Sequence, residues 1–326
     1  MEYKTNAQDV KHPPVLCGSG NFAPEGTRSS AYENREAPLS RLGLERAMQT
    51  GAILEGTAVL CDGEHRLTVD LGCMRGIMER EEVLLCGEGE EVRDIAVITR
   101  VGKRICFVIT GFARRPDGEE VAILSRREAQ RRCREEYLNH LVPGDVILAK
   151  VTHLEHFGAF VDIGCGIVSL LSIDCISVSR IAHPSDRFYA GMAIYVVVRS
   201  IVPGGRICVS HKELLGTWEE NAALFTPGQT VTGIVRSIEE YGVFIELTPN
   251  LAGLAEYRSD ITVGQSAAVY IKNMIAARMK VKLVLVDTYR GEGSARGIKY
   301  FITSGHMDRW QYSPSCAERM VETVFS

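Results

Sequence analysis

The sequence predicts an all-β fold in which five-stranded barrels follow one another along the chain and are joined by short helical linkers. From residue 51 onward, apolar residues come in runs of five to eight separated by Gly, Pro and Asp, which is typical of short strands and turns. A segment of about 27 residues also recurs 84 positions later without a gap. Two charged stretches, 125–141 and 211–224, have helical character, and Pro-Gly follows each. The first two observations indicate the barrels, and the third indicates the linkers.

The internal repeat sets the size of the predicted barrels. Pro143-Gly144 aligns with Pro227-Gly228, and the later copy is 11 residues shorter between its third and fourth strands. Five short strands in about 70 residues suit a closed barrel, because closure leaves no exposed sheet edge. A degenerate copy precedes these two, between Gly51 and Ser125. In the middle copy we expect strands at 145–154, 157–163, 166–171, 192–201 and 205–210.

The rest of the chain divides around these copies. Residues 1–37 are rich in Asn, Pro, Gly, Ser and charge, and we expect a disordered tail there. A short helix over 38–50 opens the degenerate unit, and the aromatic-rich carboxyl end is expected to pack on the last barrel. The predicted units after the tail are a degenerate barrel at 38–126, a helical linker at 127–141, barrels at 142–213 and 227–288 separated by a linker at 214–226, and an extension at 289–326.

Composition and motifs exclude several classes of function. Lys and Arg number 37 against 41 Asp and Glu, so the molecule is not a polycation that grips nucleic acid by charge alone. No apolar run approaches the ~18 residues of a membrane span, and no secretory signal is present, so we expect a cytoplasmic protein without membrane contact. The ten cysteines form no CxxC pair, and we expect them to be buried, reduced thiols. Since no catalytic signature occurs, we expect no enzyme, no catalytic residue, no cofactor and no metal.

A pair of aromatic residues around a glycine carries the functional hypothesis. It occurs as Phe157-Gly158-Ala159-Phe160 and again as Tyr241-Gly242-Val243-Phe244. Positions i and i+3 of a regular strand point to opposite faces, but a glycine bulge would re-phase the pleat and bring both rings to one face. Exposed rings can stack unpaired bases at ~1 to 3 kcal/mol per base. The alternative is that these rings only fill the barrels.

We expect cations on the predicted fifth strand to meet the phosphates. Arg206 and Lys212 follow the first aromatic pair, whereas Arg278, Lys280 and Lys282 follow the second. Each, taken alone, is equally explained as ordinary solvated surface charge. Together with the rings, they predict single-stranded RNA binding with little sequence preference.

These motifs resemble the RNA-binding domain of ribosomal protein S-one. The resemblance rests on Pro-Gly, a Val-rich strand, Phe-Gly-Ala-Phe-Val-Asp and the Gly-Arg-Ile-x-Val-Ser-x-Lys of 205–212; it covers 142–288 well and 51–125 faintly. It implies OB-fold barrels, messenger RNA as ligand and the small ribosomal subunit as partner. The family's two aromatics and its fifth-strand basic residue are matched, the latter by Arg206 and Lys280. Its third-strand histidine is not: Ser172 and Glu256 stand there, so we expect modest affinity from the last barrel.

The degenerate copy departs further from this pattern. His65 and Thr68 stand where the aromatics belong, and residues 51–99 hold 11 acidic and 4 basic residues. Because an acidic face repels RNA, we expect this unit to dock protein or to pack on its neighbour. The arginines that follow it are interpreted either as an RNA contact or as a solvated helix face. They are Arg126, Arg127, Arg131, Arg132 and Arg134.

Two other functions fit the same sequence. The barrels would serve equally as RNA-feeding modules of a ribonuclease or transcription assembly, which requires a catalytic partner. They would also fit a protein-docking scaffold that no longer contacts RNA, an interpretation favoured by the acidic balance and the missing histidine.

Overall fold

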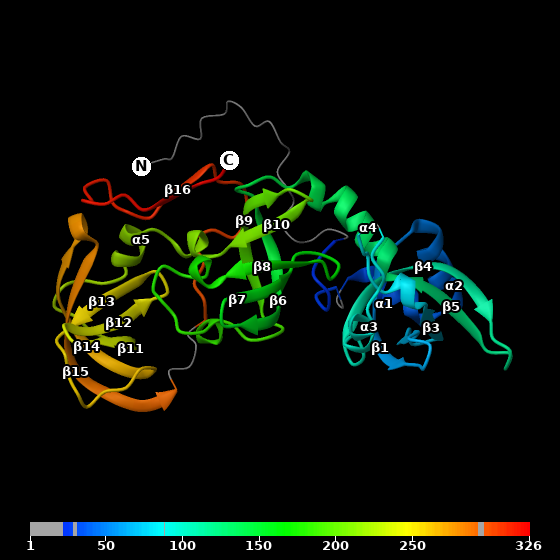
Figure 1. The fold of residues 1–326 in the computed structure, drawn as a ribbon, viewed down its shortest axis with the longest axis horizontal. Helices are drawn as coiled ribbons and strands as arrows, with labels where there is room; N and C mark the ends of the chain where they lie inside the picture. Colours follow the sequence, from blue (N-terminus) through cyan, green and yellow to red (C-terminus); the bar gives the residue numbers. More distant parts are fainter. Residues whose placement is uncertain (1–21, 29–30, 88, 293–296) are drawn as a thin grey trace.

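The fold consists of three closed five-stranded barrels arranged in a row (Figure 1). The computed structural model describes residues 22–28, 31–87, 89–292 and 297–326. The prediction of tandem all-β barrels with helical linkers is confirmed. Within the described residues, no helix is long and apolar enough to cross a membrane.

The first barrel has the strand order β1-β2-β3-β5-β4. Three short helical segments precede it: α1 (Tyr32–Glu36), η1 (Ala37–Leu39) and α2 (Arg41–Thr50). The side chain of Ser40 caps α2 by accepting the Gly43 N–H, and Gly51 ends the helix with φ of 63°. Between β3 and β4 lie η2 (Arg80–Glu82) and α3 (Asp94–Ile98). The strands are β1 (Leu54–Cys61), β2 (Leu67–Asp70), β3 (Arg75–Met78), β4 (Arg104–Arg114) and β5 (Glu120–Ser125).

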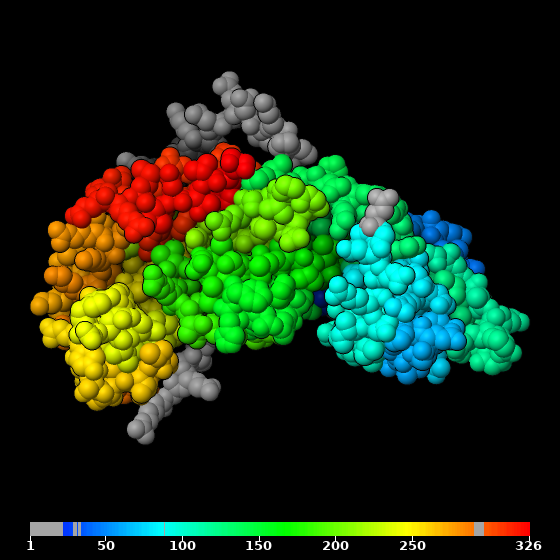
Figure 2. Space-filling view, viewed as in Figure 1, coloured from blue at the N-terminus to red at the C-terminus, as the bar shows by residue number. Residues whose placement is uncertain are grey.

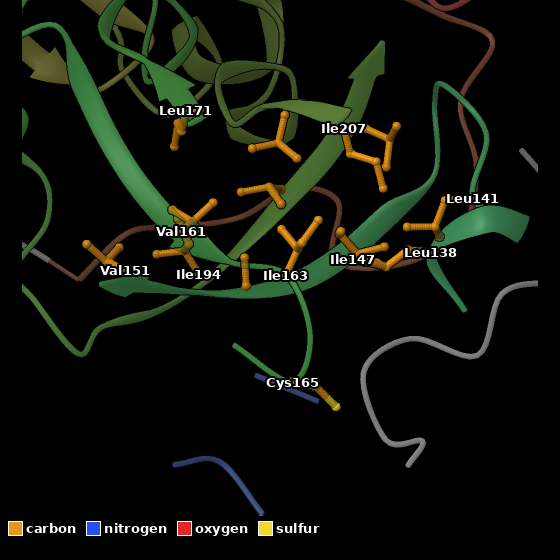
Figure 3. Close-up of a cluster of buried hydrophobic side chains, with 14 of the residues drawn as sticks. Leu138, Leu141, Ile147, Val151, Val161, Ile163, Cys165, Leu171, Ile194 and Ile207 are labelled. Atoms are coloured by element: carbon orange, nitrogen blue, oxygen red, sulfur yellow. The ribbon is translucent and has the colours of Figure 1, made fainter. Parts of the chain in front are cut away.

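The second barrel follows a helical linker, α4 (Arg126–Glu136) and η3 (Leu138–His140). Its strand order is β10-β8-β7-β6-β9, and its core is the cluster drawn in Figure 3, where Ile147, Val161 and Ile194 point into the barrel. The strands begin and end within two residues of the predicted positions. They are β6 (Val146–Glu155), β7 (Gly158–Asp162), β8 (Val168–Ser172), β9 (Ala193–Val202) and β10 (Arg206–Ser210).

The third barrel follows η6 (Lys212–Leu215) and α5 (Trp218–Ala222), and has the order β11-β12-β13-β15-β14. A tight turn, η7 (Ala276–Arg278), joins its two longest strands. The strands are β11 (Thr230–Glu239), β12 (Gly242–Thr248), β13 (Leu251–Ala255), β14 (Gln265–Ile275) and β15 (Lys280–Glu292).

The second and third barrels are joined by the long β8–β9 connection, which contains η4 (Ile173–Cys175) and η5 (Pro184–Asp186). This connection carries the 11 residues that the third barrel lacks. The Ser179 N–H donates to the Pro249 carbonyl at 3.0 Å, and the buried Arg187 guanidinium pairs with the buried Glu246 carboxylate. The extra residues of the second barrel therefore build its contact with the third.

The carboxyl-terminal extension lies across both of these barrels (Figure 2). Its short strands β16 (Arg309–Gln311) and β17 (Glu322–Val324) pair with each other, and Trp310, Tyr312 and Phe325 are buried. They share one core with residues of the third barrel and with Val146 and Val197 of the second. Packing on the last barrel was expected; the contact with the second barrel was not.

The expected disordered tail is wrong for residues 22–28 and 31–37, whereas residues 1–21 lie outside the described part of the chain. Glu25 is buried between the first two barrels. Its carboxylate pairs with the Arg126 guanidinium at 2.7 Å, and its N–H donates to the Asp162 carboxylate at 2.7 Å. Composition suggested disorder. A short polar segment nevertheless becomes ordered when its polar groups pair with charged groups that are buried between two barrels.

Candidate nucleic-acid interface

The aromatic pair of the second barrel lies at the β6–β7 hairpin. Phe157 is in the turn immediately before β7, and its side chain is 54% exposed. Phe160 lies on β7, partly buried, with its ring centroid 6.0 Å from that of Phe157 and the two planes at 89°. The two rings therefore form one edge-to-face pair on the outside of the barrel.

Glycine brings the rings together by a route other than the predicted one. A Cβ on Gly158 would lie 2.3 Å from the Leu171 carbonyl oxygen, so only glycine permits β7 to approach β8 this closely. The bulge lies instead on β6, where the register shifts between Val151 and His153. The expectation of a bulge at the glycine is thus wrong. Phe157 shares a face with Phe160 because it sits in the turn and is free of the strand pleat.

The third barrel repeats this geometry closely. Tyr241 is 70% exposed, and its ring lies 6.1 Å from that of the partly buried Phe244 at 87°. A Cβ on Gly242 would lie 2.5 Å from the Ala255 carbonyl oxygen, and β11 carries the bulge between Val235 and Ser237. The second and third barrels therefore present the same exposed pair.

A third ring, missed in the sequence, joins the pair of the second barrel. The His153 ring stacks on Phe160 with centroids 6.4 Å apart and planes 22° apart, and its Nε2 lies 2.7 Å from the Glu155 carboxylate. The β6 bulge places it there, and periodicity alone does not reveal a bulge. Ser237 occupies the equivalent place opposite Phe244. The second barrel thus has the larger aromatic surface.

Three of the predicted cations lie on the same outer face as the rings. In the third barrel, Phe244 pairs with Leu254, which in turn lies beside Lys282 on β15. Lys280 is two residues back along β15, and both lysines are exposed. In the second barrel, Phe160 pairs with Leu170 on β8. The next residue of β8, Leu171, pairs with Val209 on β10. In this register, Arg206 has the position on β10 that Lys280 has on β15 of the third barrel.

The other two predicted cations are partly engaged by the protein. The Lys212 ammonium donates to the Asp174 carbonyl at 3.2 Å, and the Arg278 guanidinium pairs with Glu318 at 3.1 Å. Both cations therefore already have a partner within the protein.

The arginines of the α4 linker are also largely committed within the molecule. Arg126 is 1% exposed and pairs with Glu25, and Arg127 pairs with Glu82. Arg131 bonds to Glu128 and Glu135, and Arg132 pairs with Glu136. This pattern favours the solvated helix face over an RNA contact for the exposed members, and Arg126 is a structural residue.

The first barrel has no comparable surface at the corresponding positions. Thr68 pairs with Ile77 between β2 and β3, and His65 lies in the turn with its Nε2 3.7 Å from the Asp94 carboxylate. Glu256, at the place of the expected histidine in the third barrel, is exposed and directly follows Ala255, the ladder partner of Val243. Within the described residues, no group of three His, Cys, Asp or Glu side chains is arranged to hold a metal ion.

The chain is similar in sequence to a family of RNA-binding domains and to ribosomal proteins. A family model described as the S1 RNA binding domain matches residues 141–212. The small ribosomal subunit protein bS1 homolog of Bacillus subtilis is 33% identical over 219 residues, covering 65% of this chain and 54% of that protein. The small ribosomal subunit protein bS1 of Rhodopseudomonas palustris is 30% identical over 265 residues, covering 76% and 45%.

The chain therefore spans about half the length of the curated relatives it matches. Among solved structures, a multidomain protein with nucleic acid binding domains from Streptococcus pneumoniae is 14% identical, with a TM-score of 0.24, over 73% of this chain and 74% of that one.

Proposed function

We propose that this chain, whose residues 141–212 belong to the S1 RNA binding domain family, holds single-stranded messenger RNA by base stacking and phosphate contacts. One observation carries the proposal: two barrels expose an edge-to-face aromatic pair at equivalent positions, with cations on the same face. Stacking on Phe157, Phe160, Tyr241 and Phe244 requires no particular base, so binding is expected to be weakly selective. The role is binding, without catalysis, in the cytoplasm.

The test is a titration of the full chain with a fluorescent single-stranded RNA. The double variant Phe160→Ala and Phe244→Ala removes one ring from each pair, and at ~1 to 3 kcal/mol per stacked base the affinity should fall at least tenfold. Tyr289→Ala is the matched control, because Tyr289 is half exposed on β15 but seven residues along the strand from Lys282. Equal affinities for the double variant and the control would reject the proposal.

For the first barrel we propose protein docking, with the small ribosomal subunit as the partner. Support comes from its missing aromatic pair and from apolar side chains that it exposes, among them Leu60 and Ile95 at 55% and 63%. Co-sedimentation of the chain with ribosomal subunits tests this. Loss of co-sedimentation on Leu60→Ser with Ile95→Ser, at unchanged RNA affinity, is the expected result. Capture of a ribonuclease or an RNA polymerase in place of the subunit would favour the RNA-feeding alternative.

A further inference from the structure

A cleft of about 520 Å³ lies where the third barrel meets the carboxyl-terminal extension. The β14–β15 turn forms one wall with Arg278 and Lys280. The β8–β9 connection of the second barrel contributes Ser179, and the extension closes the cleft with Tyr312 and Arg319. In Figure 2 the red extension lies directly against the orange segment that contains this turn. Three parts of the chain that are distant in sequence therefore build one concave surface.

The cleft continues the outer face that carries the aromatic pair. Ladder partners place Phe244, Leu254 and Lys282 side by side across β12, β13 and β15. Two residues further along the same face lie Ala252 and Lys280, and both line the cleft. Two residues of a strand span about 6 to 7 Å. A strand of nucleic acid that stacks on Phe244 and passes Lys282 thus meets the mouth of the cleft next.

The charge of the cleft suits phosphate. Among the described residues, the charged groups that line it are three cations and the carboxylate of Glu318, which pairs with Arg278. Lys280 and Arg319 are exposed, and within the described part of the chain neither has a carboxylate within ion-pair distance. The Glu318 N–H donates to the Ala277 carbonyl at 2.8 Å, so the extension is tied to the turn at this point. Ammonium and guanidinium groups are donors only and bind phosphate oxygens strongly.

We infer that this cleft binds backbone phosphates of the RNA strand that stacks on Tyr241 and Phe244, and that Arg319 is a binding residue supplied by the extension. The inference rests on the proposed function and adds to it a part of the site outside the barrels. The extension then has two roles: it fixes the third barrel against the second, and it lengthens the RNA path of the third barrel. It also offsets the weak aromatic surface of that barrel, where Ser237 replaces a ring.

The experiment measures binding of the full chain to fluorescein-labelled oligouridylate of about 20 nucleotides, longer than the ~4 to 16 that one OB barrel covers. Affinity is followed against salt concentration. Arg319→Ala should weaken binding about three- to tenfold at low salt and lower the slope of log affinity against log salt by about 0.7, the value of one phosphate contact with a single strand. Glu318→Gln should have the opposite effect, because it removes a carboxylate from the cleft lining and releases Arg278.

The control is Arg309→Ala, which loses the same charge from the same extension at a position on β16 that does not line the cleft. Far-ultraviolet circular dichroism establishes that the variants fold. If Arg319→Ala matches Arg309→Ala in both affinity and slope, the inference is overturned while the proposed function stands. If the unaltered chain fails to bind the probe, or binds it independently of Phe160 and Phe244, the proposed function itself fails.

Discussion

His211 should make the attachment of the extension to the second barrel sensitive to acid. Its ring is fully buried at the start of η6. Nδ1 lies 2.7 Å from the Ile176 carbonyl oxygen and therefore donates, so Nε2 of the neutral ring accepts from the Tyr300 hydroxyl at 3.0 Å. Burial, together with the positive charge of Arg187, lowers the pKa of His211 from 6.5 to about 4. The folded protein thus holds a neutral ring where the unfolded chain would be protonated.

The sign and size of the effect follow from this difference. Below pH 6.5 the unfolded chain binds a proton that the folded state excludes until about pH 4, so the stability contributed by the neutral ring is full above 6.5 and declines as the pH falls. At about 1.4 kcal/mol for each tenfold difference in proton affinity, the loss amounts to about 3 kcal/mol by pH 4. Other groups titrate in the same pH range. The contribution of His211 is therefore measured against a variant that lacks only this titrating group.

The variant is His211→Gln, which keeps a donor and an acceptor but does not titrate. Urea unfolding followed by tryptophan fluorescence suits the test, because the only two tryptophans, Trp218 and Trp310, are buried in the core that the extension completes. Between pH 7 and pH 4 the unaltered protein should lose about 3 kcal/mol more than the variant. Parallel pH profiles for the two proteins would refute the assignment of a neutral buried His211.

Two further perturbations test the packing. Glu25→Gln should destabilise the protein by about 3 to 5 kcal/mol, because it leaves the buried Arg126 charge without its partner. Arg131→Gln, at an exposed ion pair, should change the stability little. Thermal unfolding compares the two variants, and similar losses would contradict a buried pair. Gly158→Ala should cost about 1 to 3 kcal/mol, since its Cβ would overlap a carbonyl of β8, but Gly111→Ala, where the space is open, should be nearly neutral in urea unfolding. A tolerated alanine at position 158 would show that the two strands can separate there without loss.

Much of the architecture could be predicted because the repeat and the turn residues are local signals. The strands of the second barrel and the α4 linker begin and end within a few residues of their predicted positions, and the resemblance to ribosomal protein S-one is confirmed by the family match. The exposed aromatic pairs also lie where the glycine motifs suggested, although through a turn and a close strand contact.

What could not be predicted depends on contacts between distant segments. The order of residues 22–28 depends on the contacts of Glu25 with Arg126 and Asp162, which lie 101 and 137 residues from it in the sequence. His153 reaches Phe160 only through a bulge that no periodicity reveals. Arg319 lines the cleft of the third barrel only once the extension has folded back across two barrels. Composition correctly describes the first 37 residues as polar, but burial and partners are properties of the folded chain.

The β8–β9 connection and the extension hold the second and third barrels against each other. This contact changes how the two barrels would combine their affinities for RNA. When two binding modules are joined by a flexible linker, the second module meets the ligand at an effective concentration that the linker sets. Here the extension shares one core with both barrels, so an RNA strand that binds as proposed would pass from the ring pair of the second barrel to that of the third along one path. The affinity would then depend on whether an RNA strand can follow that path. A hairpin stem in the RNA between the two sites would have to open before both ring pairs are occupied.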